Sequence, residues 1–208
     1  MLLGYRQNSD GICVEDSRSV LVRDCFVRTG DDCFEIKSRY GNCTIPIEDI
    51  TFDNCNAWPD KARGIGIICE TRRDMTDIHF INCSVGFASA TWMEDLGALV
   101  VYADGQAQIT DVEFRNIEIY RADKYPINIT VGDDATAQID GLTFSNIRIL
   151  FSNNKIRVCN RSKAGGTIDN VQFKNIYRKG TAATDSKSLG LSLSKVDESS
   201  IRVSRTAP

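Results

Sequence analysis

The chain alternates apolar and polar residues in short segments, and one such segment recurs along most of its length. Its form is an apolar residue, any residue, Phe, any residue, Asn, and then Cys or Ile. It occupies residues 50–55, 78–83, 112–117, 142–147 and 171–176, with a degenerate first copy at 20–25. The Phe advances by 28, 34, 30 and 29 residues from Phe52 onward. Self-similarity at a fixed period of this size predicts a repeat architecture.

The alternation within each copy has the period of a β-strand. The Asn at the end of the copy suits a turn, because its side chain bonds nearby backbone and tolerates the left-handed conformation. A second set of apolar segments lies between the copies, at residues 12–14, 34–37, 65–69, 99–102, 127–131 and 156–159. No segment has the pattern of a long amphipathic helix. The sequence therefore predicts an all-β solenoid of six to seven coils.

The repeat also predicts what each position does. Five Phe residues are expected to stack in one internal column: Phe52, Phe80, Phe114, Phe144 and Phe173. The Asn residues are expected to form a ladder along the coils: Asn54, Asn82, Asn116, Asn146 and Asn175. Residues 1–179 are thus one solenoid domain. Residues 180–208 form a Ser/Thr-rich C-terminal segment, in which 191–203 alternates weakly and is expected to add a last strand.

Composition narrows the class of protein further. The 208 residues are 42% hydrophobic, which suffices for one domain with a continuous core. The net charge of −3 and the lack of a basic stripe argue against a nucleic-acid partner. The chain has no run of 18 apolar residues, so no membrane partner is expected. Its first five residues are too short for a signal peptide.

The eight cysteines do not predict disulfides or a metal site. Cys25, Cys55 and Cys83 occupy a slot that holds Ile in later copies, so they are expected to be reduced, buried and stacked. The others lack the spacing of zinc ligands, and they are Cys13, Cys33, Cys43, Cys69 and Cys159. No cofactor and no metal are therefore predicted.

Two acidic signatures lie about one strand repeat apart. Asp10 is followed by Gly11, and Asp31 and Asp32 come 21 and 22 residues after Asp10. Each leads directly into a strand of the second set, so the three carboxylates are expected on one face of neighbouring coils. Crowded carboxylates shift each other's pKa values, which is typical of acid–base chemistry. A second Gly-Asp-Asp, at 132–134, follows a strand instead and is predicted to be only a turn.

These motifs resemble those of glycoside hydrolase family 28, the polygalacturonase family. Residues 8–11, Asn-Ser-Asp-Gly, are similar to the family's Asn-Thr-Asp-Gly, and residues 30–33 match its Gly-Asp-Asp-Cys. The resemblance implies a single-stranded right-handed parallel β-helix, of the pectin-lyase-like kind. It implies inverting hydrolysis of a pectin-like or related polysaccharide, with Asp31 as general acid and Asp10 and Asp32 activating water. It also implies a secreted or periplasmic location.

The chain departs from that family in two motifs and in length. The family's Gly-His-Gly is absent, and Arg63, in the segment Arg-Gly-Ile-Gly, is expected in the histidine's place beside Asp31. The only histidine, His79, occupies an outward slot of the repeat. No Arg-x-Lys motif is found. The family has several coils before its first motif, so the chain is interpreted as N-terminally short or truncated, with a partner or missing coils covering the first coil.

Further candidate substrate contacts follow from strand alternation. Phe34 and Ile36 are expected in the core, which turns Glu35 and Lys37 toward the aspartates. Trp58 and Trp92 precede strands of the second set and are candidates for stacking on sugar rings. Glu70 follows the third such strand and is placed at the rim.

Two other functions remain open from the sequence. The first alternative is a non-catalytic β-helix module that binds carbohydrate, an adhesin-type module or a pseudo-enzyme. A β-helix lyase or epimerase is less favoured, because such enzymes need a cation cluster or a His/Tyr pair that the chain does not offer.

Overall fold

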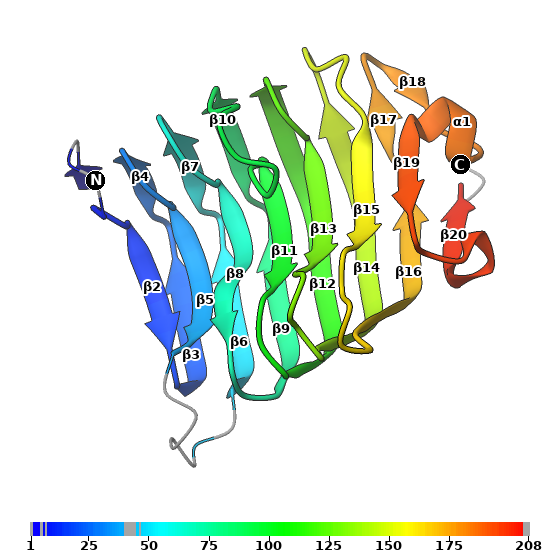
Figure 1. Ribbon diagram of the computed structural model, residues 1–208. Coiled ribbons are helices and arrows are strands. Elements are labelled where there is room, and N and C mark those ends of the chain that lie inside the picture. Colours follow the sequence, from blue (N-terminus) through cyan, green and yellow to red (C-terminus); the bar gives the residue numbers. More distant parts are fainter. Residues whose placement is uncertain (1, 5, 7, 40–44, 46, 206–208) are drawn as a thin grey trace.

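The computed structural model describes residues 2–4, 6, 8–39, 45 and 47–205, and it is a parallel β-solenoid wound in a right-handed sense (Figure 1). Seven strands form one sheet: β2 (Ile12–Glu15), β5 (Phe34–Ser38), β8 (Ile65–Thr71), β11 (Leu99–Ala103), β13 (Ile127–Val131), β15 (Ile156–Asn160) and β19 (Leu191–Ser194). We call it the front sheet, because it faces the viewer in Figure 1.

The other strands belong to a sheet that wraps around the rest of the coil. Its first part holds the repeat phrases: β3 (Arg18–Arg23), β6 (Ile47–Asp53), β9 (Met75–Ile81), β12 (Gln108–Ala122), β14 (Gln138–Ile149), β16 (Thr167–Lys174) and β20 (Ile201–Ser204). Its second part holds β1 (Leu2–Gly4), β4 (Phe26–Thr29), β7 (Asn56–Pro59), β10 (Ser84–Ala88), β17 (Tyr177–Arg178) and β18 (Thr181–Ala182). β12 and β14 are long enough to run through both parts.

Each coil therefore has three strand positions, whereas the sequence predicts two. The second set of segments predicted from the sequence becomes the front sheet, and the repeat phrases pair with one another in register. The third strand follows the Asn turn, as β7 follows Asn54. The sequence interpretation missed it because these strands are short and, in β12 and β14, continuous with the repeat phrase. About six coils are formed.

Stacked aromatic rings fill the centre of the solenoid, as the repeat predicts. Consecutive Phe rings from Phe52 to Phe173 lie 4.7–5.2 Å apart and within 17° of parallel. Each is 0–1% exposed. The parallel register aligns each Phe with its neighbours one strand spacing away, so the rings overlap face to face. Phe34, from β5, meets the first ring edge-on at 5.8 Å.

The Asn residues of the repeat turn the chain and bond to one another. All five have φ between 52° and 56°, a conformation that Asn tolerates better than most residues. The side-chain amides of Asn116, Asn146 and Asn175 each donate to the Asn one coil earlier, at 3.0–3.1 Å. Asn82 departs from the predicted ladder, because its amide donates to Asp53 at 2.8 Å instead of to Asn54.

The cysteine column is confirmed only in part. Cys55 and Cys83 are buried, and the seven cysteines in the described part of the chain are free thiols; Cys43 lies outside it. Cys25 is half-buried, so the expectation that it is buried is wrong. It lies two residues after the end of β3, which pairs only with β6 among the described strands. Because no described strand lies on the other side of β3, this slot is open to solvent.

The C-terminal residues extend both sheets. β19 pairs with β15 and β20 with β16, and a short helix, α1 (Ser186–Leu189), precedes β19. A 3-10 turn, η1 (Glu198–Ser200), precedes β20. The domain division at residue 179 stays a prediction. Among the described residues, no helix has the length and apolar character needed to cross a membrane.

The Phe column predicts a stability difference that a matched pair of variants can measure. Phe114→Ala is expected to lower the free energy of unfolding by about 3–5 kcal/mol, because it leaves a cavity between two stacked rings. Phe151→Ala is the control, since Phe151 is 61% exposed and its loss is expected to cost less than about 0.5 kcal/mol. Urea unfolding of both variants measures the difference, and equal losses would contradict a ring-filled core.

Candidate active site

The two acidic signatures meet at the start of the front sheet. Ile12, Phe34 and Ile65 are paired across β2, β5 and β8. Asp10, Asp32 and Arg63 each stand two residues before one of these paired positions, so they lie side by side on neighbouring coils. Backbone bonds continue the ladder there, from the Gly11 amide to the Asp32 carbonyl at 2.8 Å and from the Cys33 amide to the Arg63 carbonyl at 3.1 Å. One column of the solenoid thus carries two carboxylates and a guanidinium.

Gly11 explains why this column packs so closely. A Cβ atom on Gly11 would lie 2.3 Å from the Cys33 carbonyl oxygen and 2.4 Å from a methyl group of Val27. No side chain fits at such distances, so only Gly allows the strand after Asp10 to approach the next coil. The Asp-Gly pair of the first signature therefore has a steric reason as well as a chemical one.

Arg63 joins two carboxylates in a buried cluster. Its Nη1 lies 3.0 Å from Asp32 Oδ2, its backbone N–H donates to Asp32 Oδ1 at 2.8 Å, and its Nη2 bonds the Asp95 carboxylate. All three side chains are less than 9% exposed. Burial raises the pKa of Asp32, and the charge and backbone amide of Arg63 oppose that rise. Arg63 also lines one depression together with Asp31, and its ionic partners are Asp32 and Asp95. Its role in the histidine's place stays a prediction.

Asp31 faces an open depression of about 290 Å³, whose lining residues are Asn8, Gly30, Asp31, Lys61, Ala62, Arg63 and Trp92. Two backbone amides fix its carboxylate: the Asn8 N–H donates to Oδ2 at 2.9 Å and the Asp32 N–H to Oδ1 at 3.1 Å. The side chain is thus oriented by the backbone while one side stays accessible. We call this space the aspartate depression.

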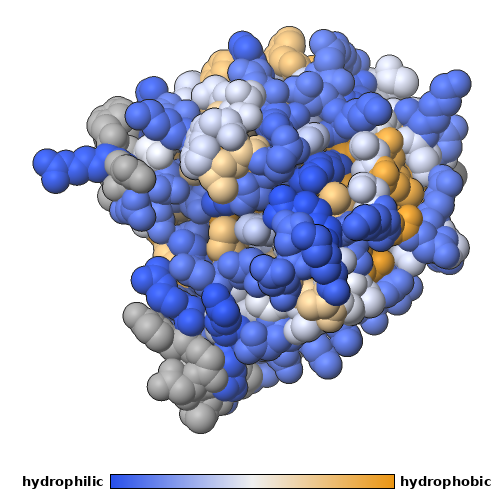
Figure 2. All heavy atoms as spheres, in the orientation of Figure 1, coloured by the Kyte–Doolittle hydropathy of each residue, from blue (hydrophilic) through white to orange (hydrophobic). Residues whose placement is uncertain are grey.

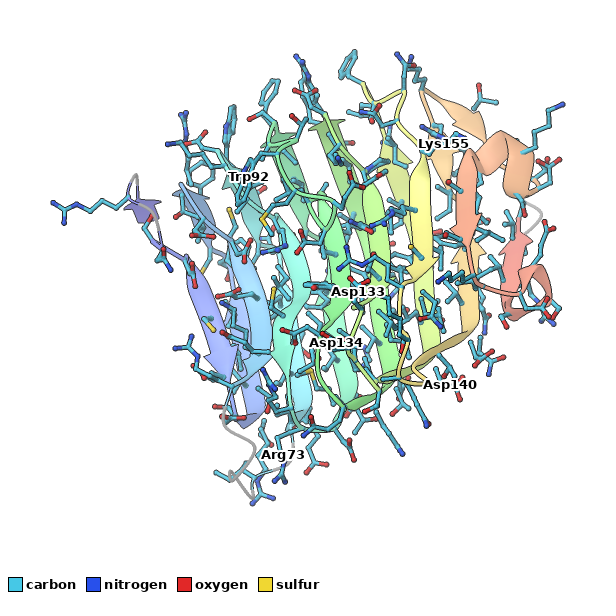
Figure 3. The ribbon with its side chains drawn as sticks, viewed as in Figure 1. Arg73, Trp92, Asp133, Asp134, Asp140 and Lys155 are labelled. Atoms are coloured by element: carbon cyan, nitrogen blue, oxygen red, sulfur yellow. The ribbon has the colours of Figure 1, made fainter. Side chains whose placement is uncertain are left out.

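Trp92 lies at the same depression. It comes from the irregular segment between β10 and β11, and Figure 3 shows it near the upper end of the front sheet. Its indole N–H donates to the Lys61 carbonyl at 2.7 Å, and the side chain is 68% exposed. An exposed indole beside a carboxylate suits stacking on a sugar ring, and that role stays a prediction.

A second chain of charges links Asp10 to the front sheet. Lys37 Nζ lies 3.2 Å from Asp10 Oδ2 and 2.9 Å from Glu35 Oε1. The alternation prediction is confirmed, because Phe34 and Ile36 are in the core and Glu35 and Lys37 are on the opposite face. Glu35, however, is fully buried there, and Lys37 only 8% exposed. Glu35 therefore supports Lys37 and Asp10 and is not placed to touch a substrate.

Burial gives Glu35 a pH-dependent effect on stability. Desolvation, with the charge of Asp32 adding to it, raises the pKa of Glu35 to about 8 despite the neighbouring Lys37. A carboxyl whose pKa rises on folding stabilises the fold fully below its unfolded pKa of about 4.3, and that contribution is lost as pH rises toward 8. Glu35→Gln mimics the protonated form, so its unfolding free energy is expected to fall less than that of wild type between pH 5 and pH 8.

Urea midpoints at the two pH values measure this difference. Glu198→Gln serves as the control, because Glu198 is exposed and its replacement leaves the pH dependence of the wild type in place. If Glu35→Gln loses as much stability between pH 5 and pH 8 as wild type does, then Glu35 is not held protonated by the fold.

Two predicted contacts lie elsewhere. Glu70 is near the carboxyl end of β8, where its Oε2 lies 3.5 Å from Arg39 Nε, away from the aspartates at the strand starts. Trp58 is in β7, outside the front sheet, and its ring packs 4.8 Å from that of Phe87. Trp58 therefore does not line the aspartate depression, and its stacking on a sugar ring stays a prediction. Trp58 follows the Asn turn and therefore lies on the third strand of the coil. The sequence interpretation had predicted only two strands per coil.

Two site residues were missed from the sequence. Asp95 lies in the irregular 91–97 segment, and no local pattern marks it as the partner of Arg63. Tyr102 lies on β11 with its ring centroid 6.0 Å from the Arg63 guanidinium carbon. The strand of Tyr102 was identified, but the pairing needed knowledge of which coil carries Arg63. His79 is on the outer face of β9, 2.8 Å from Asp77, as predicted from its slot.

The second Gly-Asp-Asp is a turn, as predicted. Asp133 and Asp134 follow β13, and Asp133 is paired with Arg161 at 3.3 Å on the surface. Figure 3 shows both aspartates well below Trp92, so they lie apart from the aspartate depression. Asp133 is therefore a suitable control for substitutions at Asp31.

Comparisons with known proteins agree with this geometry. The chain is 24% identical over 179 residues to polygalacturonase-2 of Solanum lycopersicum and 25% identical over 184 residues to a polygalacturonase of Juniperus ashei. Each alignment covers 85% of this chain. The chain is a polygalacturonase-like parallel β-helix. No family model matches it, and no solved structure matches it significantly.

The likeness covers only part of those relatives. The chain spans 32% of the tomato protein's length and 29% of the juniper protein's.

Proposed function

We propose that the protein is an inverting glycoside hydrolase that cleaves O-glycosidic bonds of a pectin-like or related polysaccharide outside the cell. The observation that carries the proposal is the placement of Asp31 at an open depression, with Asp10 and Asp32 in the adjoining register column. The polygalacturonase likeness supports the choice of reaction class. An exposed Trp92 at the same depression offers a surface for a sugar ring.

Each of the three aspartates is assigned a different role in the reaction because its surroundings differ. Asp31, held by two backbone amides, gives its proton to the leaving glycosidic oxygen as the bond to the anomeric carbon breaks. Asp10, the more accessible of the other two, takes a proton from the attacking water. Lys37 orients Asp10 through an ion pair of 3.2 Å. Asp32 holds that water and the local geometry through Arg63, since both of its oxygens accept from Arg63.

The test is release of reducing ends from a panel of polysaccharides. Polygalacturonate, rhamnogalacturonan and xylogalacturonan are the first substrates, and wild type and Asp31→Asn are compared on each. Reducing ends are expected from at least one of them with wild type only. If wild type releases none from the whole panel, or if Asp31→Asn is as active as wild type, the proposed function is wrong.

The product should carry an inverted anomeric configuration. Water attacks opposite to the leaving group when one carboxyl acts as acid and another as base, which needs the two about 6.5–9.5 Å apart. Proton NMR of the first product formed checks this before mutarotation. Retention would require a carboxylate nucleophile and would remove Asp10 and Asp32 from the role of activating water.

A second candidate function has one observation in its favour. The histidine of the family's Gly-His-Gly motif has no counterpart near the aspartates, and the buried Arg63 lies in that segment. A non-catalytic module that binds carbohydrate, adhesin-type or pseudo-enzyme, would fit that loss. Binding of a polysaccharide without release of reducing ends would favour it.

A further inference from the structure

Aromatic side chains, two of them exposed and two half-buried, form a row along the outside of the solenoid, apart from the lining of the aspartate depression. These four form the outer aromatic stripe: Trp58, Phe87, Tyr120 and Phe151. Neighbouring ring centroids lie 4.8, 5.2 and 4.8 Å apart, and the rings are tilted by 40–58°. Trp58 comes from β7, Phe87 from β10 and Tyr120 from β12, and Phe151 is the second residue after β14. Each ring therefore belongs to a different coil. Hydrophobic groups stand among hydrophilic ones along the upper edge in Figure 2, where β7 and β10 end in Figure 1.

Core packing does not account for this stripe. Phe151 is 61% exposed and Tyr120 is 43% exposed, whereas the Phe residues of the core are 0–1% exposed. Trp58 packs over Gly86, where a Cβ atom would lie 2.9 Å from the indole. A row of touching aromatic rings, two of them exposed, offers faces on which a ligand can stack.

The stripe borders two depressions of ligand size. One, of about 390 Å³, is lined by Phe26, Trp58, Phe87 and Tyr120 together with Asn56, Ser84 and Glu118. The other, of about 510 Å³, is lined by Phe87, Tyr120 and Phe151 together with Asp123, Asn153 and Asn154. Aromatic faces beside a few amide, hydroxyl and carboxylate groups are the usual lining of small-molecule sites. No lining residue is shared with the aspartate depression.

The charges around the stripe favour an uncharged ligand. Arg28 is paired with Asp60 at 3.0 Å, Arg121 with Asp123 at 2.7 Å, and Arg148 with Glu118 at 3.9 Å. Each of these three arginines thus has a carboxylate beside it. A further cation, Lys179, bonds the Asn153 side chain at the edge of the second depression, so little excess charge is offered to a polyanion. The apolar faces suit the C–H faces of sugar rings, and the amides and carboxylates suit hydroxyl groups.

We propose that the outer aromatic stripe is a second carbohydrate-binding site, which holds an uncharged stretch of polysaccharide along the solenoid axis. The ligand class rests on the proposed function, since the polysaccharide held on the stripe would be the same molecule whose other part enters the aspartate depression. The stripe lies close to that depression: Trp58 is three residues before Lys61, which lines it. A neutral segment of a polysaccharide held on the stripe keeps the neighbouring segment near Asp31.

The two tryptophans of the chain allow each site to be observed separately. Trp92→Phe leaves Trp58 as the only tryptophan, and its emission then reports the stripe. In this variant, combined with Asp31→Asn to prevent turnover, neutral β-1,4-linked galactohexaose and xylohexaose are the probes and hexagalacturonate is the acidic comparison. At least one neutral probe is expected to give a saturable change in Trp58 emission, with weaker binding of hexagalacturonate.

Removal of the two most exposed rings gives the decisive comparison. Tyr120→Ala with Phe151→Ala is expected to weaken binding of the neutral probe at least tenfold, while Leu21→Ala, at an exposed leucine on the outside of β3, leaves it unchanged. Circular dichroism and urea unfolding confirm that the variants fold. Unchanged affinity in the double variant, or no saturable response to either neutral probe, overturns the proposal.

Other occupants give distinct results. If the stripe binds a second copy of the chain, sedimentation will show a concentration-dependent dimer that the double variant abolishes, and the proposal of a sugar ligand is then wrong. Failure of the proposed hydrolase function is separate, because it appears as absent reducing-end release by wild type whether or not Trp58 responds to the neutral probe.

Discussion

Asp31→Asn is expected to lower the rate of polysaccharide hydrolysis by at least about 10²-fold, because a positioned general acid typically contributes 10²–10⁴. Asparagine has nearly the same shape, and its side-chain oxygen accepts from one of the two backbone amides that hold Asp31. The fold is therefore kept while the proton donor is lost. Initial rates of reducing-end release measure the effect on the best substrate found in the panel.

The chain supplies a matched control for this substitution. Asp133→Asn changes the same residue type in the same Gly-Asp-Asp sequence, but at an exposed turn paired with Arg161. Its activity is expected to stay close to that of wild type. Equal losses at Asp31 and Asp133 would mean that the first motif, like the second, is only a turn.

Arg63→Ala is expected to destabilise the fold by about 3–5 kcal/mol, since it leaves the carboxylates of Asp32 and Asp95 buried without their cation. Loss of the guanidinium also raises the pKa of Asp32 further, because burial already favours its neutral form and Arg63 opposes that effect. Activity is expected to fall and the pH–rate profile to shift to higher pH. Urea unfolding and rates between pH 4 and pH 8 measure the two effects.

Two further variants separate this cluster from ordinary ion pairs. Arg115→Ala breaks a half-exposed pair with Glu113 and is expected to cost no more than about 1 kcal/mol. Arg63→Met combined with Asp32→Asn and Asp95→Asn removes the buried charges together, so stability is expected to return in part while activity does not. A pH–rate profile of Arg63→Ala identical to that of wild type would remove Arg63 from the active site.

The sequence determined the fold through features that act locally and repeat. Alternation puts Phe52 and the Phe of each later repeat on the inner face of their strands. A period near 30 residues then stacks these faces in every coil. Asn at the turn needs only its own backbone conformation, which is why φ near 55° recurs at all five positions. Asp10 and Asp32 could also be brought together from the sequence, because each directly precedes a strand and neighbouring strands share a register.

The tertiary structure alone decided what each polar side chain meets. The third strand of each coil moved Trp58 to the outside, although Trp58 and Trp92 look alike in the sequence. Asp95 reaches Arg63 from an irregular segment whose path depends on packing over the front sheet and not on any periodic pattern. Glu35 is polar and alternates outward, yet the neighbouring coils bury it completely. Periodicity fixes which face a residue takes, but charge pairing and burial depend on contacts between coils, which a single repeat does not encode.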